Sequence, residues 1–239
     1  MKLDVYFTPL GLTAGDLAGR GVVVIDVLRA TTTIVAALAS GARAVVPAAS
    51  SEDAVRMTAN LERDGFVLAG ERKYLSVPGF ALGNSPREMT PELVGGKTLY
   101  LATTNGTPAL VAAQGADPVL VGAAVNFSAT AERAGEVLRE RGDLVIICAG
   151  REKQFALEDA YAAGRFVKAV KKGLRKLVLN DSASVALGLT QRYKSWPDAF
   201  TACEAGRQLK ELDLADDVAF CAEADRFAIV PGYSERRIT

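Results

Sequence analysis

The fold of this chain is decided by the stretch GVVVIDVLRATTTIVAALASG, which occupies residues 21–41. Residues 22–25 are an unbroken β-branched run, which is typical of a strand buried on both faces of a sheet. The three threonines at 31–33 can cap a helix start, and the small apolar residues at 34–39 predict a helix that packs close to the sheet. A strand, a polar loop and a helix in this order form half of a βαβ unit, so the stretch predicts an α/β fold.

Two charged residues, Asp26 and Arg29, lie in the predicted loop between this strand and this helix. Open α/β sheets bind ligands outside the carboxyl ends of their strands, and the free N–H groups at a helix start favour anions, phosphate above all. The loop would therefore aim a carboxylate, a guanidinium and several hydroxyls at one crevice. A structural role is the alternative, in which Asp26 caps the helix and Arg29 pairs with it.

The rest of the chain alternates between the same two kinds of pattern. Strands are predicted at residues 3–7, 22–25, 44–48, 66–70, 99–102, 119–121, 144–148, 218–221 and 227–230, and helices at 34–39, 50–63, 108–114, 128–141, 155–172, 182–193 and 198–212. This alternation favours a mostly parallel sheet covered by helices on both faces. No linker rich in Gly, Ser or Pro interrupts the 239 residues, so we expect one continuous domain over residues 1–239.

Composition excludes several classes of function. The formal net charge is +0, which gives no global positive field for nucleic acid, and the basic residues at 168–176 fit a solvated helix face. No run of about 18 apolar residues is available to span a membrane, and the N-terminus is charged too early for a signal peptide. Three distant cysteines form neither a disulfide framework nor a zinc motif. We expect a cytoplasmic protein that has no nucleic-acid partner and no membrane partner.

The chain contains 0 His residues. A Ser-His-Asp triad, a Cys-His pair and a His-ligated metal are therefore excluded. Carboxylates, hydroxyls, amides, Arg, Lys or Cys must carry the chemistry, and any metal would be a hard cation with oxygen ligands, such as Mg²⁺. Cys148 lies in an apolar strand with no histidine to activate it, which indicates a buried thiol rather than a nucleophile.

Polar residues follow the predicted strands repeatedly. They are Asp26, Arg29, Glu71, Arg72, Thr103 to Thr107, Asn126, Gly150 and Arg151. Because the carboxyl ends of parallel strands lie along one edge of a sheet, these residues are predicted to converge in one site. Loops are polar in most proteins, so an accidental accumulation is the alternative.

Three motifs have both a functional and a structural interpretation. The run TTNGT at 103–107 could bind an anion through hydroxyls and backbone N–H groups, or could be a turn followed by a helix cap. The long loop at 73–88 carries Asn84 and Ser85, which could bind a ligand or cap a short helix. Glu158 and Asp159 could act in catalysis, although the helix dipole alone favours carboxylates near a helix start. None of these runs matches a Walker or Rossmann motif, so nucleotide binding is not indicated.

Taken together and in this order, the motifs resemble those of the 2-phosphosulfolactate phosphatase family, the ComB-like proteins. They are VIDVLRATTT (24–33), LAGER (68–72), GFALGNSP (79–86), TTNGT (103–107), CAGR (148–151) and FALED (155–159). The resemblance covers nearly the whole chain. It implies a three-layer α/β/α fold with a mostly parallel or mixed sheet. It also implies Mg²⁺-dependent hydrolysis of a small phosphorylated acid, (2R)-2-phospho-3-sulfolactate, to phosphate and 3-sulfolactate, which feeds coenzyme M synthesis.

The resemblance further implies roles for individual residues. The catalytic residues would be Asp26, Arg29, Glu158 and Asp159, and the metal ligands would be Asp26, Glu71 and Asp159. The phosphate or the substrate would be bound by Thr31, Thr32, Arg72, Asn84, Ser85, Thr104, Asn105, Gly106, Thr107, Asn126 and Arg151. One departure is the segment KYLSVP at 73–78, where a loop with glycine is expected, and it bears on substrate preference. The resemblance and the apolar content lead us to expect a homodimer.

A Mg²⁺ ion held by carboxylates, with Arg and backbone N–H donors around the phosphate, can stabilise phosphoryl transfer without histidine. Asp26 could hold the metal and orient a water molecule, or could attack phosphorus itself. Two other hypotheses stay open from the sequence. One is a non-catalytic protein that binds a small anion, and the other is a hydrolase or transferase that acts on a different phosphorylated acid.

Overall fold

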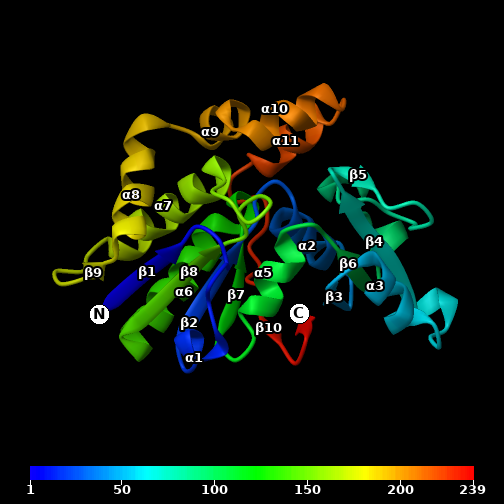
Figure 1. Ribbon diagram of the computed structural model, residues 1–239, viewed down its shortest axis with the longest axis horizontal. Helices are drawn as coiled ribbons and strands as arrows, with labels where there is room; N and C mark the ends of the chain where they lie inside the picture. The colour runs from blue at the N-terminus through cyan, green and yellow to red at the C-terminus, as the bar shows by residue number, and fades with distance from the viewer.

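The computed structural model describes residues 1–239, apart from the side chain of Ala14, and contains two β-sheets with helices packed between and around them (Figure 1). The first, sheet A, is parallel throughout, with the strand order β7-β2-β8-β1-β9. Its strands are β1 (Lys2–Tyr6), β2 (Gly21–Ile25), β7 (Val119–Gly122), β8 (Asp143–Cys148) and β9 (Val178–Leu179). The β-branched run quoted above lies in β2, which pairs with β7 and β8 and whose five residues are all buried.

The second, sheet B, is mixed, with the strand order β10-β11-β3-β6-β4-β5. Its parallel centre is β3 (Ala44–Ala48), β6 (Thr98–Ala102) and β4 (Phe66–Arg72), and antiparallel pairing adds β5 (Leu75–Ser76), β10 (Tyr233–Ser234) and β11 (Arg237–Ile238). An isolated bridge between Leu120 and Gly232 joins the C-terminal segment to β7. The end of the chain therefore connects the two sheets.

Helices cover both faces of sheet A, which confirms the predicted three-layer α/β/α arrangement around it. The helices α6 (Phe127–Arg141), α7 (Leu157–Lys171) and α8 (Asp181–Arg192) pack on one face, and α2 (Ala30–Ala39) and α5 (Gly106–Ala112) pack on the other. The middle pair, α2 and α5, also contacts sheet B, whose other face is covered by α3 (Ser51–Thr58) (Figure 1). Shorter helices are α1 (Ala14–Leu17), α4 (Pro91–Val94), α9 (Trp196–Ala202), α10 (Glu204–Glu211) and α11 (Ala215–Cys221), with 3-10 turns η1 (Arg63–Gly65), η2 (Pro86–Glu88) and η3 (Ala124–Asn126).

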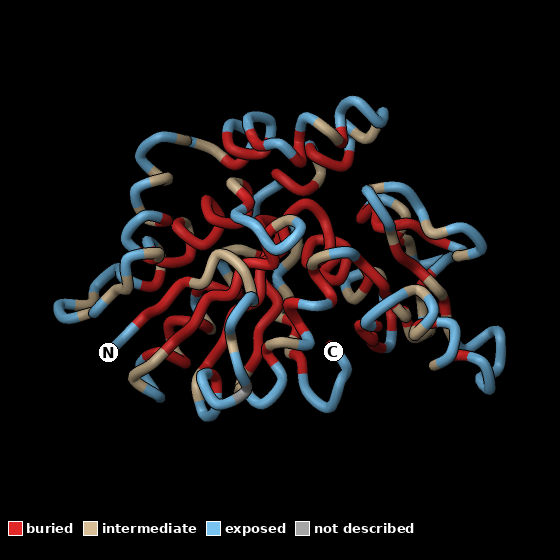
Figure 2. The backbone as a smooth tube through the Cα atoms, in the orientation of Figure 1, coloured by how far each residue is buried: buried red, intermediate tan, exposed pale blue. Residues whose placement is uncertain are grey.

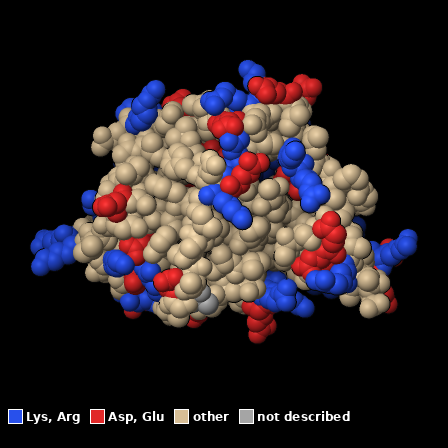
Figure 3. All heavy atoms as spheres, in the orientation of Figure 1, with Lys and Arg blue, Asp and Glu red and all other residues tan. Residues whose placement is uncertain are grey.

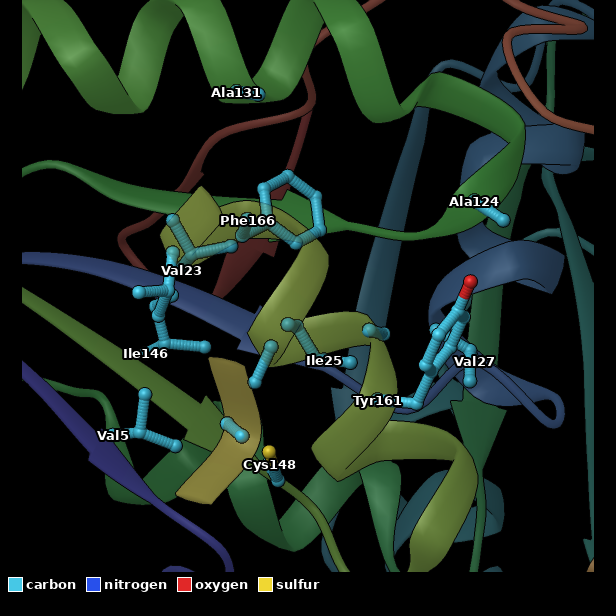
Figure 4. Packing of buried hydrophobic residues seen from close by; sticks show 14 of the residues in the cluster. Val5, Val23, Ile25, Val27, Ala124, Ala131, Ile146, Cys148, Tyr161 and Phe166 are labelled. Carbon is cyan, nitrogen blue, oxygen red and sulfur yellow. The ribbon is translucent and has the colours of Figure 1, made fainter. Parts of the chain in front are cut away.

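Because side chains alternate between the two faces of sheet A, the core is divided into two clusters, one on each face. Val23 and Ile25 of β2 pack with Tyr161 and Phe166 of α7. Val22 and Val24 point to the opposite face, toward α2 and α5. Figure 4 shows the first of these clusters, and Figure 2 shows that the buried backbone runs through the strands of sheet A. Within the part of the chain that the structure describes, no helix has both the length and the apolar character needed to cross a membrane.

Two of the predicted strands are wrong. Residues 218–221 belong to helix α11, because a short apolar run fits a buried helix face as well as a strand, and the acidic pair Asp216 and Asp217 favours a helix start before it. Residues 227–230 form no strand; the N–H of Phe227 donates one hydrogen bond to the Val125 carbonyl, and its ring packs against η3. The helix predicted at 198–212 is two helices, α9 and α10, separated at Cys203.

Candidate active site

A cavity of about 480 Å³ opens where the carboxyl ends of strands from both sheets meet. It is lined by Asp26, Leu28, Arg29, Glu71, Lys73, Tyr74, Asn84, Thr104, Asn105, Arg151, Glu152, Glu204, Gln208, Glu211 and Leu212. The prediction of a single sheet edge is therefore wrong. The loops after β2 and β8 come from sheet A, the loops after β4 and β6 come from sheet B, and one face of α10 closes the side. Figure 3 shows acidic and basic side chains gathered next to one another between α10 and these loops.

Asp26 follows β2 directly and lines the cavity, although only 8% of its surface is exposed. Its carboxylate oxygen Oδ1 accepts the N–H of Ala30 at 3.3 Å, so Asp26 partly caps α2. The main chain of Asp26 is fixed by Thr31, whose hydroxyl donates to the Asp26 carbonyl at 2.8 Å and accepts from its N–H at 3.1 Å. One hydrogen bond therefore holds the carboxylate and two hold the main chain that carries it, while no hydrogen bond among the described residues involves the Asp26 Oδ2.

The threonines at the start of α2 do not contribute their hydroxyls to the cavity, and the prediction that they cap the helix is also wrong. Thr31 and Thr32 are fully buried, and the Thr32 hydroxyl donates to the Val27 carbonyl at 2.9 Å. Helix α2 begins at Ala30, with Arg29 as its N-cap, and the side chain that accepts an N–H of its first turn is that of Asp26 and not that of a threonine. In the structure these hydroxyls stabilise the loop that presents Asp26.

Burial raises the pKa of the Asp26 carboxyl to about 7, and the negative charges of Glu71 and Glu158 act in the same direction. The N–H of Ala30 and the Arg29 guanidinium oppose this rise. A carboxyl that titrates near neutrality in a cavity is typical of a functional group rather than of a structural ion pair.

Gly106, at the start of α5, lets this helix approach Asp26 and the start of α2. A Cβ atom at position 106 would lie 2.4 Å from the Ala30 Cβ and 2.6 Å from the Asp26 Oδ2. The glycine of the TTNGT run is thus needed for the close approach of α5 to the Asp26 carboxylate.

We expect the Gly106→Ala variant to lose about 1–3 kcal/mol of unfolding free energy, because the methyl group must displace Asp26 or Ala30. Chemical denaturation with urea would measure the loss. Gly188→Ala is the control, because a Cβ at that position in α8 meets no atom within 4 Å, and it should stabilise the protein by up to about 1 kcal/mol. Equal stability of the wild type and Gly106→Ala would contradict the proposed contact.

Arg29 does not pair with Asp26, which was the structural alternative. Its Nη1 forms a buried ion pair with Asp217 of α11 at 2.6 Å, and its Nη2 donates to the Tyr74 carbonyl at 2.7 Å. Ser85 donates its hydroxyl to the other Asp217 oxygen at 2.6 Å and does not line the cavity. The Nε atom of Arg29 is buried and has no partner among the described residues.

Glu71 and Asn105 tie neighbouring loops together around the cavity. The two oxygens of Glu71 accept the N–H groups of Tyr74 and Thr104, both at 2.8 Å. The Oδ1 atom of Asn105 accepts the N–H of Glu152 at 2.9 Å. These contacts join the loops after β4, β6 and β8, and they leave Glu71 with less capacity for a metal than a free carboxylate would have.

Asn84 stands out among the lining residues, because its Oδ1 is buried and has no hydrogen-bond partner among the described residues. Only 4% of the Asn84 surface is exposed. A buried polar atom without a partner is costly, and such an atom in a cavity points to a ligand or cation that completes its contacts.

Glu158 and Asp159 lie behind the cavity rather than in it. Asp159, at the start of α7, accepts the N–H of Val27 at 2.9 Å and that of Gly150 at 3.1 Å, so it connects the loops after β2 and β8. Glu158 lines an adjoining cavity of about 220 Å³ beside Cys203, which shares Arg151 and Glu204 with the larger one. Burial raises the pKa of both carboxyls.

The other predicted binding residues divide into two groups. Thr104 and Arg151 line the cavity, and Arg151 forms an ion pair with Glu204 of α10. The remaining three do not line it: Thr107 exchanges hydrogen bonds with Thr103, Asn126 is buried and bonds to Val121 and Ile229, and Arg72 is exposed beside a neighbouring cavity.

Sequence reasoning missed Tyr74, Glu204 and Asp217. Tyr74 belongs to the segment that was noted only as a departure from the expected loop, and Asp217 precedes a run that was predicted to be a strand. Glu204 lies on α10, inside a region predicted to be one long helix. No pattern in the sequence links these residues to Arg29 or Arg151, because the contacts are made between distant elements.

The oxygen donors of the cavity fit a hard divalent cation. Asn84 Oδ1 is buried without a hydrogen-bond partner, and the hydrogen bond that the Asp26 carboxylate accepts uses its Oδ1 and leaves Oδ2 without one. Mg²⁺ is commonly held by one or two carboxylates together with waters and substrate phosphate. Among the described residues, no three Asp, Glu or Cys side chains are placed to share one ion, so Asp26, Glu71 and Asp159 do not form a common ligand set. The site therefore fits an ion that takes few ligands from the protein.

Comparison with known proteins identifies relatives over almost the whole chain. The family model for 2-phosphosulpholactate phosphatase matches residues 6–236. A probable 2-phosphosulfolactate phosphatase of Symbiobacterium thermophilum is 40% identical over 226 residues, which cover 94% of this chain and 96% of that protein. Proteins of the same name are 38% identical in Caldanaerobacter subterraneus subsp. tengcongensis, over 97% of this chain and 95% of that protein, and 38% identical in Picosynechococcus sp., over 98% and 96%. The chain belongs to the 2-phosphosulfolactate phosphatase family.

Proposed function

We propose that this protein is a Mg²⁺-dependent phosphatase that converts (2R)-2-phospho-3-sulfolactate to 3-sulfolactate and phosphate. The observation that carries the proposal is the position of Asp26, a carboxylate with a near-neutral pKa in a cavity formed by the loops that contain the family motifs. The family match over residues 6–236 supports phosphate monoester hydrolysis as the reaction.

The charges of the cavity support the need for a cation. Five acidic residues line it, and these are Asp26, Glu71, Glu152, Glu204 and Glu211. The basic residues are Arg29, Lys73 and Arg151, and two of them are already paired, with Asp217 and Glu204. A substrate that carries phosphate, sulfonate and carboxylate would be repelled by this lining unless a divalent cation offset the excess negative charge.

Asp26 and Asn84 are the residues that would hold Mg²⁺, with Glu71 beside them. When bound, the ion would neutralise negative charge on the phosphate oxygens during hydrolysis. Arg29 is fixed by Asp217 and Tyr74 and donates from its free Nε to the substrate anion. Ionised Asp26 either orients the attacking water or attacks phosphorus, and α10 limits the access of solvent.

The test is phosphate release by the purified protein from 2-phosphosulfolactate. We expect turnover with Mg²⁺, loss of turnover with EDTA, and recovery when excess Mg²⁺ is added. 2-Phospholactate and other small phosphorylated acids serve as comparison substrates. Absence of turnover with every substrate of the panel, in protein that remains folded, would reject the proposed function.

We expect the activity to depend on pH through Asp26. Because burial raises the pKa of this carboxyl to about 7, it is protonated below that pH and ionised above it. If the ionised form is required, kcat/KM should fall as the pH decreases through about 7. Because a bound cation favours the ionised carboxylate, higher Mg²⁺ concentrations should shift this decrease in kcat/KM to lower pH. A pH–rate profile at two Mg²⁺ concentrations measures both effects, and a flat profile between pH 5 and pH 8 would contradict the assignment.

A further inference from the structure

A second cavity, of about 340 Å³, lies between α7 and α8 beside the first residue of α6. It shares no lining residue with the candidate active site. Four of its nine lining residues are basic, and these are Arg165, Lys168, Lys172 and Lys194; none of the nine is acidic. We propose that this cavity, defined here as the α7–α8 cavity, is a binding site for a small organic anion of the phosphate class that carries at least two negative charges.

The first argument is the lack of neutralisation. Among the described side chains, none of these four cations forms an ion pair with an acidic residue, whereas Arg29 and Arg151 of the candidate active site are both paired. Arg165 and Lys168 lie three residues apart on α7, and Lys172 is the residue that follows the helix; all three line the cavity. Like charges around one space repel one another, so an anion between them would relieve this repulsion.

The second argument is that Arg165 is held in position. Its Nη1 donates to the Tyr161 hydroxyl at 2.8 Å, and its guanidinium lies 4.7 Å from the centre of the Trp196 ring and 5.5 Å from that of Phe127. Tyr161 and Trp196 are buried in the core, so the guanidinium is attached to a rigid base. A planar guanidinium held in this way is suited to bidentate contact with phosphate oxygens, and the lysines add mobile point charges.

The third argument concerns the size and walls of the cavity. Its aromatic walls include Tyr161 and Tyr193, whose rings are 6.2 Å apart and nearly perpendicular. A volume of about 340 Å³ accommodates a small organic phosphate, and the formal net charge of +0 provides no extended field for a nucleic acid. Four cations around a space of this size favour a compact polyanion.

The test uses inorganic pyrophosphate as the probe, with binding measured by calorimetry at low ionic strength on protein that has first been freed of divalent cations by passage over an immobilised chelator. This step removes the divalent cation that anion binding in the candidate active site would require, and it leaves no soluble chelator that could compete with pyrophosphate. We expect the wild type to bind pyrophosphate, and the Lys168→Ala/Lys172→Ala variant to bind at least about tenfold more weakly.

The matched control is Lys171→Ala/Lys176→Ala, which removes the same charge from neighbouring exposed positions that do not line the cavity. We expect its Kd for pyrophosphate to stay within about twofold of the wild-type value. Equal weakening in both variants would mean general attraction to a basic surface and would overturn the proposal. The proposal would also be overturned if the wild type showed no measurable binding of pyrophosphate. This includes the case in which another subunit covers this face.

Discussion

The Asp26→Asn variant is expected to lose turnover by on the order of 10³-fold or more while it remains folded. The amide retains the size of the side chain and an oxygen that can accept the N–H of Ala30, but it cannot ionise. As a nucleophile or as the group that orients and deprotonates water, Asp26 requires its negative charge, and as a cation ligand a neutral amide oxygen binds more weakly than a carboxylate. Steady-state kinetics with 2-phosphosulfolactate would measure the loss.

Stability separates this loss from unfolding. The folded pKa of Asp26 is raised above its ordinary value, so the folded state binds an extra proton between about pH 4 and pH 7, and the ionised carboxyl destabilises the fold above this range. Asn carries no charge, so Asp26→Asn should be at least as stable as the wild type at pH 8. This combination of lost activity and retained stability is the signature of a functional carboxylate.

Glu211→Gln is the matched control for Asp26→Asn, because Glu211 lines the same cavity from the exposed end of α10. We expect its kcat/KM to change by less than about threefold. If Asp26→Asn kept more than a tenth of wild-type activity, or if both variants lost activity equally, Asp26 would not be the group on which hydrolysis depends.

The second large effect is expected from Asp217→Ala, which removes the partner of Arg29. Both side chains of this ion pair are almost completely buried, with 1% and 2% of their surfaces exposed. Removing one member leaves a buried guanidinium without its counter-charge, which typically costs about 3–5 kcal/mol. For a chain of this length we expect Tm to fall by about 10 °C. Urea denaturation and a thermal scan would measure the two quantities.

The neighbouring Asp216→Ala variant provides the control for Asp217→Ala. Asp216 forms an ion pair with Arg87 at 3.1 Å, but 74% and 53% of these two side chains are exposed. Solvent screens such a pair, so its loss should change the unfolding free energy by less than about 1 kcal/mol. A similar effect of the two substitutions would show that burial of the Arg29 pair is not what stabilises this region.

Parts of the site could be anticipated because they depend on local sequence. The β-branched run of β2 predicts a buried strand, and the residue after such a strand lies at its carboxyl end, so Asp26 could be placed at the cavity. The glycine of the TTNGT run was expected to let backbone N–H groups approach an anion, whereas the structure uses it for the approach of α5 to Asp26 and Ala30. Mg²⁺ dependence, a homodimer and a cytoplasmic location remain predictions.

Other parts of the site could not be anticipated, because the same polar residue type can either bind a ligand or form hydrogen bonds inside the protein. Thr31 and Asn126 follow strands as a ligand-binding residue would, but both are used for internal hydrogen bonds and lie fully buried. Asp159 has the charge of a metal ligand, yet its oxygens accept two backbone N–H groups. Whether a polar side chain faces a cavity or a neighbouring loop depends on contacts that local sequence does not specify.

The sequence by itself determined the α/β class, the absence of histidine chemistry and the family motifs, since these depend on composition and on short-range order. Only the tertiary structure decided that two sheets contribute to one cavity, that Arg29 pairs with Asp217 across 188 positions, and that Asn84 is left with a free oxygen. The physical reason is that periodicity fixes which side of an element is buried, whereas the partner of a buried charge is fixed by how distant elements pack.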